Sequence, residues 1–140
     1  MAIPKTLRLE FVTPERAIAH EEVDEVELPG EEGYMGILPG HAPLLASLRT
    51  GEMWYRKGGE RHYAFLTGGF VEVLPDRVSI LAQVAERAED IDHDRAEAAK
   101  LKAETLLAGP VADMDFERAR ISLLRAIARL QVSEHKRSRS

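Results

Sequence analysis

The 140-residue sequence contains no cysteine and no apolar run long enough to cross a membrane. Without cysteine the chain cannot form disulfide bonds, thiolate nucleophiles or cysteine-ligated zinc sites, and its composition fits a reducing compartment. The first residues, MAIPKTLRLEF, lack the charged, apolar and small-residue regions of a secretory signal. We therefore expect neither export nor a transit peptide.

Aromatic residues are scarce, at 6% of the chain, and none follows Phe116. Charge is unevenly distributed: residues 1–86 carry 14 acids and 8 bases, whereas residues 116–140 carry 2 acids and 7 bases. A nucleic-acid interface needs basic residues interleaved with aromatics or a recognisable module. The sequence has neither, so we expect no nucleic-acid partner and interpret the basic segment as a solvated or protein-binding helix.

The sequence also lacks the motifs of common catalytic and metal sites. There is no phosphate-binding G-x-x-x-x-G-K-[ST] pattern and no G-x-S-x-G nucleophile elbow. The five histidines are not spaced as metal ligands, and we expect His41, in a turn flanked by prolines, to form structural hydrogen bonds. We predict no catalytic residue and no metal site.

Up to about Val84 apolar residues alternate with polar ones, which is typical of half-buried strands. The alternation covers four segments: residues 7–11, 26–28, 71–73 and 78–84. Turn signals separate the strands, and Gly58-Gly59 is the best hairpin candidate, joining Met53–Arg56 to His62–Leu66. This spacing predicts an antiparallel sandwich or barrel.

From Ile91 onward the apolar period becomes that of a helix. Asp92 and Asp94 suit a helix start, and alanines and leucines then recur until Gly109-Pro110. A second helix is expected after Asp113 or Asp115, with one apolar face from Phe116 to Leu130. We predict an antiparallel two-helix hairpin in residues 87–133, after a β domain in residues 1–86, and a disordered basic tail in residues 134–140.

The segment Gly30–Leu48 combines glycines and prolines with apolar side chains. Such punctuation indicates an ordered loop shaped for contact. Its large apolar residues are expected to be buried; they are Tyr34, Met35, Ile37, Leu38, Leu44 and Leu45.

Charged residues cluster in and before the helices. Glu86 precedes the run Ile91-Asp92-His93-Asp94-Arg95-Ala96, and Arg125 and Arg129 lie four residues apart, on one helix face. The arginines could converge on a polyanion near the free N–H groups of the first helix. Equally, Asp92 could be an ordinary cap and the arginines a solvated helix face. Spacing alone leaves both interpretations open.

The chain resembles the epsilon subunit family of F-type ATP synthase from Leu7 to about Leu130. The specific segments are GYMGILPGHAPLLASLRTG (Gly33–Gly51), FLTGGFVEV (Phe65–Val73) and the R-A-x-x-R-L run Arg125–Leu130. The resemblance implies an N-terminal β-sandwich, a C-terminal helical hairpin and a non-catalytic role in the rotor stalk. It further implies that the protein lies at the cytoplasmic face of a bacterial membrane, or less readily a thylakoid membrane, associated with it only through the complex.

The same resemblance implies partners. The sandwich of family members binds the gamma subunit and the ring of c subunits, with Glu31, Glu32, Tyr34 and Met35 as ring-contact candidates. The hairpin of family members switches between a folded-down form and an extended form that reaches the catalytic alpha and beta subunits and restrains ATP hydrolysis.

Some bacterial members bind ATP between the helices, which holds the hairpin down. Their [I/L]-D-x-x-R-A motif is present here as Ile91-Asp92-His93-Asp94-Arg95-Ala96. By this resemblance the ATP-binding residues are Glu86, Ile91, Asp92, Arg95, Ala96, Arg125 and Arg129. ATP is then a regulatory ligand, and no cofactor is required.

Three other functions compete with this interpretation. One is a purely structural stalk subunit whose hairpin never extends, and a second is a free-standing β-sandwich module with a helical dimerisation arm. An independent enzyme is the weakest, because the sequence offers no nucleophile, metal set or paired carboxylates.

Overall fold

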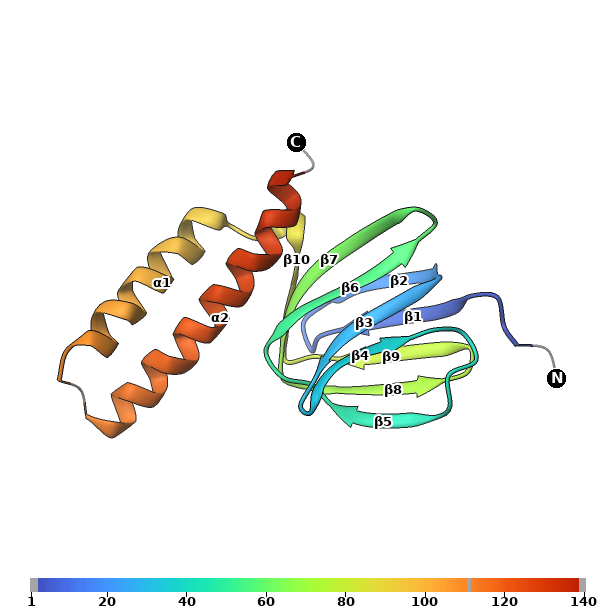
Figure 1. Cartoon of the computed structure of the whole chain (residues 1–140), viewed down its shortest axis with the longest axis horizontal. Coiled ribbons are helices and arrows are strands. Elements are labelled where there is room, and N and C mark those ends of the chain that lie inside the picture. The colour runs from blue at the N-terminus through green and yellow to red at the C-terminus, as the bar shows by residue number, and fades with distance from the viewer. Residues whose placement is uncertain (1–2, 111, 139–140) are drawn as a thin grey trace.

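A computed structural model describes residues 3–110 and 112–138, and over these residues the chain forms ten strands, one 3-10 turn and two helices (Figure 1). The strands are β1 (Leu7–Val12), β2 (Ala17–Val23), β3 (Glu25–Gly30), β4 (Gly33–Ile37), β5 (Leu44–Ser47), β6 (Gly51–Lys57), β7 (Glu60–Thr67), β8 (Phe70–Leu74), β9 (Arg77–Leu81) and β10 (Val84–Arg87). The 3-10 turn η1 (Ala88–Asp90) leads into α1 (His93–Ala108) and α2 (Asp113–Ser138). None of the described helices is long and apolar enough to span a membrane.

The strands form two five-stranded sheets that pack as a sandwich. One sheet has the order β2-β1-β9-β8-β5 and the other the order β10-β7-β6-β3-β4. All pairings are antiparallel except that of β1 with β9, in which Arg8 is the register partner of Arg77. The predicted sandwich is therefore confirmed, with one parallel pair inside it.

The core of the sandwich consists of the inward side chains of both sheets. In β1, for example, Leu7, Leu9 and Phe11 are fully buried, whereas Arg8 and Val12 are exposed. Period-two alternation places one set of side chains on each face of a strand, so the sequence pattern itself specifies which face is buried. Among the residues of α1 and α2 whose burial is described, none belongs to this core cluster.

The predicted hairpin at Gly58-Gly59 is confirmed. Strands β6 and β7 pair from Gly51–Leu66 to Lys57–Glu60, and Gly58 adopts a φ of +63° in the turn between them. Glycine suits this left-handed conformation because it has no Cβ.

Both predicted helices are present and pack against each other as a hairpin. The Asp92 carboxylate accepts a 3.0 Å hydrogen bond from the Arg95 N–H and so caps α1, as expected. Small buried residues on the facing sides, such as Ala96 and Ala103 on α1 and Ala119 and Ala126 on α2, allow the helices a close approach.

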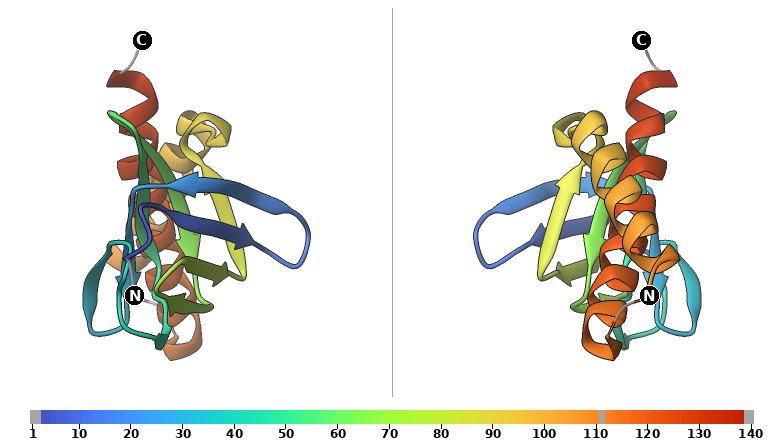
Figure 2. Two further views of the ribbon diagram at one scale, coloured as in Figure 1. Left: turned by 90° about the vertical axis from the view of Figure 1, so that its right-hand side faces the viewer. Right: turned by 90° about the vertical axis from the view of Figure 1, so that its left-hand side faces the viewer.

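A second, separate hydrophobic cluster joins the hairpin to the sandwich. Phe65 of β7 packs with Ala88 of η1, Ile91, and Ala128 and Val132 of α2. Helix α2 consequently lies between α1 and the sandwich (Figure 1). The two views of Figure 2 show both helices on one side of the β domain.

Three expectations about local structure are wrong. The tail predicted as disordered from residue 134 instead continues α2 as far as Ser138, because Val132 and Ser133 are buried and His135 contacts the sandwich; residues 139–140 lie outside the described part. The predicted strand 78–84 ends at Leu81, and the chain restarts as β10 in the opposite sheet. Segment Gly30–Leu48 is not a loop throughout, since it contains β4 and β5.

The predicted burial of that segment is also wrong for most of its large side chains. Ile37 is buried and Met35 half-buried, whereas Tyr34, Leu38, Leu44 and Leu45 are exposed, Leu45 by 73%. Strands β4 and β5 are the edge strands of their sheets, and in β5 the successive residues Leu44 and Leu45 are both exposed, although they point to opposite faces. The exposed apolar side chains are therefore available to a partner.

Candidate functional sites

A pocket of about 430 Å³ lies where α1, α2 and the end of the sandwich meet. Its lining comes from β10, η1, the cap of α1 and both helices: Glu86, Asp90, Asp92, Arg95, Ala96, Ala99, Ser122, Arg125, Ala126 and Arg129. Because three structural units contribute to this wall, the pocket exists only while the hairpin is folded against the sandwich.

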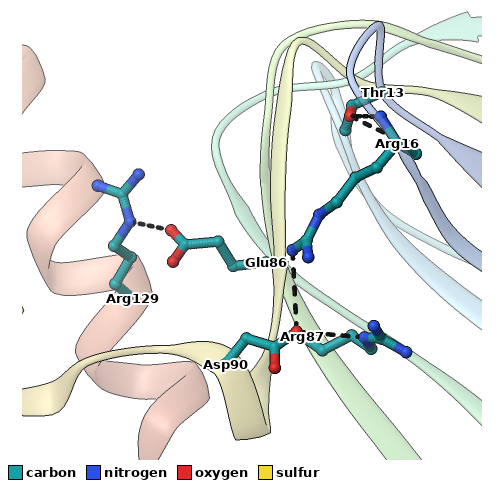
Figure 3. A network of polar contacts seen from close by, with 6 residues as sticks. All are labelled: Thr13, Arg16, Glu86, Arg87, Asp90 and Arg129. Carbon is teal, nitrogen blue, oxygen red and sulfur yellow. Dashed lines mark hydrogen bonds and ion pairs between the residues drawn. The ribbon is translucent and has the colours of Figure 1, made fainter.

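The Glu86–Arg129 pair crosses the seam between the sandwich and α2. The Arg129 Nε donates a 2.6 Å hydrogen bond to Glu86 Oε1, and both side chains are about 30% exposed. The Arg129 guanidinium also lies 4.4 Å from the centre of the Phe65 ring. Only the Nε of Arg129 is used by Glu86, and the terminal nitrogens point away from the carboxylate (Figure 3).

Asp90 lies at the same seam, but its ion-pair partners belong to the sandwich and not to α2. Its Oδ2 accepts a 3.3 Å hydrogen bond from Arg87 Nε and lies 3.8 Å from an Arg16 terminal nitrogen (Figure 3). Arg16 comes from the β1–β2 turn, where its backbone N–H donates to Thr13 Oγ1. The 3-10 turn at the base of the hairpin is thus tied to both sheets.

Two arginines of the pocket do not form an ion pair with a carboxylate of the described residues. Among the described residues Arg95 and Arg125 have no carboxylate partner, and the buried Nε of Arg125 has no hydrogen-bond partner. A buried donor without an acceptor is costly unless a ligand supplies one. The pocket is therefore suited to an anion of two or more charges.

The structure brings together six of the seven residues assigned to ATP: Glu86, Asp92, Arg95, Ala96, Arg125 and Arg129 all line the pocket. Ile91 does not line it, because its side chain is 98% buried in the cluster around Phe65. Sequence reasoning missed Asp90, Ala99, Ser122 and Ala126 as pocket residues. Helical spacing could have indicated Ala99 and Ser122, each one turn from an assigned residue.

A second concavity, of about 470 Å³, is an open groove between β4 and β5. Strand β5 is the lowest strand of the sandwich in Figure 1. It is lined by Gly30, Glu31, Glu32, Gly33, Tyr34, Met35, Leu44, Leu45, Ala46 and Ser47. All four residues assigned to the c-ring contact are therefore neighbours in one surface, together with the exposed leucines of β5.

Arg49 fixes the shape of this groove. Its Nε donates a 3.1 Å hydrogen bond to the Gly30 carbonyl, and its guanidinium lies 5.2 Å from the centre of the Tyr34 ring. The backbone N–H of Glu31 also donates to the Ser47 carbonyl, at 3.1 Å. The β3–β4 turn is thus held against β5 before any partner binds.

The predicted structural role of His41 is confirmed by two contacts. Its Nδ1 lies 2.7 Å from the Ala42 carbonyl oxygen, and its backbone N–H donates to the Leu38 carbonyl. Within residues 3–110 and 112–138 no group of three or more histidine, aspartate or glutamate side chains is arranged to hold a metal ion.

Comparison with known proteins gives consistent matches along the chain. Residues 6–88 match the family described as ATP synthase, delta/epsilon chain, beta-sandwich domain, and residues 89–134 match its long alpha-helix domain. The ATP synthase epsilon chain of Herpetosiphon aurantiacus is 50% identical over 133 residues, covering 95% of this chain and 98% of that one. That of Nitratidesulfovibrio vulgaris (strain DP4) is 48% identical over 128 residues, covering 91% and 96%.

Two solved structures share the fold at low sequence identity. A chain of the Euglena gracilis mitochondrial ATP synthase, in an OSCP/F1/c-ring assembly, aligns with a TM-score of 0.73 at 23% identity, covering 99% of this chain and 84% of that one. A chain of the Tetrahymena thermophila central stalk and c-ring gives 0.63 at 15% identity, covering 95% and 99%.

Proposed function

This chain belongs to the ATP synthase delta/epsilon family, as an epsilon chain, and from that premise we propose that it is a regulatory, non-catalytic subunit of the rotor stalk. In this proposal the sandwich binds the gamma subunit and the c ring, and the hairpin restrains ATP hydrolysis when it extends toward the alpha and beta subunits. The subunit then lies at the cytoplasmic face of a bacterial membrane, held there by the complex.

We propose that ATP binds the pocket between the hairpin and the sandwich. The unpaired Nε of Arg125 carries this proposal, because it offers a buried donor to a phosphate oxygen beside the guanidiniums of Arg95 and Arg129. Glu86 and Asp92 provide carboxylate oxygens that can accept hydrogen bonds from the amino and hydroxyl groups of a nucleoside.

ATP would regulate the hairpin because its site needs the folded-down form. Glu86 belongs to β10, Arg95 to α1 and Arg125 to α2, so an extended hairpin separates the groups that hold the ligand. A ligand shifts a two-state equilibrium only by its preference for one state. ATP at ten to a hundred times its Kd would stabilise the folded-down form by about 1.4 to 2.7 kcal/mol.

Calorimetric titration of the isolated full chain with ATP tests this proposal. We expect saturable binding at millimolar nucleotide or below, weakened at least about tenfold by Arg125→Ala, because a charge-assisted hydrogen bond is worth roughly 1.5–3 kcal/mol. Arg120→Ala is the matched control, since Arg120 lies on α2, exposed, and pairs with Glu117 instead of lining the pocket. Absence of saturable heat would leave the subunit as a purely structural part of the stalk.

Docking of the c ring at the β4–β5 groove is the second part of the proposal. The exposed apolar side chains Tyr34, Leu44 and Leu45 support it, because contiguous exposed apolar residues beside a preformed concavity are typical of an interaction site. Glu31 and Glu32 at the rim add negative charge, which favours a partner with basic or polar loops.

A further inference from the structure

The last described turns of α2 dock on the sandwich through a polar contact that lies outside the nucleotide pocket. Glu52 of β6 forms an ion pair with His135 of α2 through its Oε1, and its Oε2 accepts a 3.2 Å hydrogen bond from Gln131 Nε2. The imidazole of His135 stacks on the Tyr63 ring of β7, with centroids 3.4 Å apart and planes within 5°. One histidine thus contacts both strands on which α2 packs.

From this arrangement we propose that Glu52 and His135 form a pH-dependent latch, which holds the end of α2 on the sandwich in mildly acidic solution and weakens as the pH rises. The ion pair carries opposite charges only while the imidazole is protonated. An unperturbed histidine changes charge near pH 6.5, within the range that a bacterial cytoplasm can experience.

The carboxylate side of the pair strengthens the same dependence. The Glu52 side chain is only 13% exposed in the docked form, and this burial raises its pKa, opposed by the attraction of His135. Glu27 on the neighbouring β3 adds a second negative charge that also raises the Glu52 pKa. An ionised Glu52 is therefore costly in the docked form unless His135 carries a positive charge.

Both titrations act in one direction. Wherever the imidazole is neutral and the carboxylate ionised, the desolvated negative charge has lost its ion-pair partner, and Gln131 is the donor to it that the described residues provide. Release of α2 hydrates that charge and restores its ordinary pKa. The docked form therefore becomes less stable relative to the released form as pH rises. The raised carboxyl pKa and the loss of the imidazolium charge both favour release.

The other charged groups near this end of α2 are engaged elsewhere. On β10, Glu86 pairs with Arg129, and on η1, Asp90 pairs with Arg16 and Arg87. From α1, His93 Nδ1 lies 2.9 Å from the Ser133 hydroxyl oxygen, one half-turn from His135. His93 is a second imidazole close to this contact, so the experiment must separate its effect from that of His135.

Hydrogen exchange of the full chain, without nucleotide, tests the latch. Backbone amides of α2 around Ala128 and Val132 report release of the helix, after correction for the intrinsic dependence of exchange on pH. We expect the opening equilibrium to rise about fivefold between pH 5.5 and 8.0 in the unmodified chain, which corresponds to loss of one partly buried ion pair.

Two substitutions at His135 distinguish charge from packing. His135→Gln should keep only the smaller pH dependence that buried Glu52 contributes, whereas His135→Arg, which stays charged and can stack on Tyr63, should remain more protected at pH 8.0 than the unmodified chain. Glu52→Gln should remove the pH dependence while keeping a polar partner for Gln131. His20→Gln, at an exposed position of β2, is the matched control and should behave as the unmodified chain.

The latch is wrong if His135→Gln keeps the pH dependence of the unmodified chain, which would assign the effect to His93 or another group. It is equally wrong if the unmodified chain shows no dependence, because a contact held by packing alone would not respond to pH. The measurement uses no ATP, so its result is independent of whether nucleotide binds the pocket.

Discussion

Arg129 and Glu86, on α2 and β10 respectively, are joined by a 2.6 Å hydrogen bond that directly connects the second helix with the last strand of the sandwich. The two residues are far apart in the sequence, and both line the pocket proposed for ATP. The contact therefore has two roles, because the pair that closes the seam also presents the terminal nitrogens of Arg129 to a ligand.

Substitution of Glu86 should loosen the hairpin. Glu86→Gln replaces a charge-assisted hydrogen bond with a neutral one, and we expect docking of α2 to weaken by about 1 kcal/mol, after allowance for the partial exposure of the pair. A double-mutant cycle with Arg129→Gln, followed by hydrogen exchange of α2, measures the coupling. Glu117→Gln, which breaks an exposed pair within α2, should leave docking unchanged.

Removal of the helical hairpin should increase the rate of ATP hydrolysis by the assembled enzyme. A chain that ends at Arg87 keeps the whole sandwich core, to which no helical residue of described burial belongs. We expect the assembled enzyme to form normally with this shortened chain and to hydrolyse ATP faster than with the full chain. Equal rates of hydrolysis would show that the helices do not restrain the enzyme.

A charge placed in the β4–β5 groove should impair docking of the ring. Leu45 is 73% exposed, so Leu45→Glu should leave the free energy of unfolding nearly unchanged while weakening binding of the stalk to isolated c rings by about tenfold. Leu101→Glu, at a 58% exposed position of α1, is the control for an added surface charge. Similar binding by both variants would place the ring contact elsewhere.

Tyr55 and Glu21 predict an effect of acid on stability. A hydrogen bond from the Tyr55 hydroxyl lowers the pKa of the Glu21 carboxyl, so this group stabilises the fold above its unfolded pKa and stops doing so as pH falls through the folded pKa. Tyr55→Phe should raise the Glu21 pKa and make stability less sensitive to acid below about pH 5. Urea unfolding at several pH values tests this, with Tyr34→Phe, at a 51% exposed position away from Glu21, as the control.

Gly69 should tolerate no side chain. Its φ is +108°, and a Cβ built there would lie 2.0 Å from the Leu81 carbonyl oxygen of the neighbouring strand. Gly69→Ala should therefore cost about 3 kcal/mol or more of the free energy of unfolding. Gly59→Ala provides the comparison, because no heavy atom lies within 4 Å of the corresponding Cβ, and denaturant unfolding should show little change.

The sequence predicted those features that depend on short-range patterns. Alternation in residues 7–11 and 71–73 fixed buried faces, and Asp92 with Gly109 marked the ends of α1. Strands β4 and β5 were missed because apolar residues are adjacent in them, as in Tyr34-Met35 and Leu44-Leu45, and because the surrounding glycines and prolines indicated a loop.

Long-range contacts account for what the sequence could not predict at the sites. The family resemblance indicated six lining residues, but Asp90 joined them only because η1 folds back between Arg16 and Arg87. The Glu52–His135 contact could not be predicted from the sequence, because it too joins residues far apart in the chain. Nothing local in either residue shows that the end of α2 reaches β6.

The parallel pairing of β1 with β9 has a consequence for synthesis on the ribosome. Arg8 meets its register partner Arg77 only after most of the β domain has been translated. Until then β1 can pair with β2 but not with β9. The nascent chain should therefore stay protease-sensitive until β9 and β10 have left the exit tunnel, after which both sheets can be completed and the helices emerge beside them.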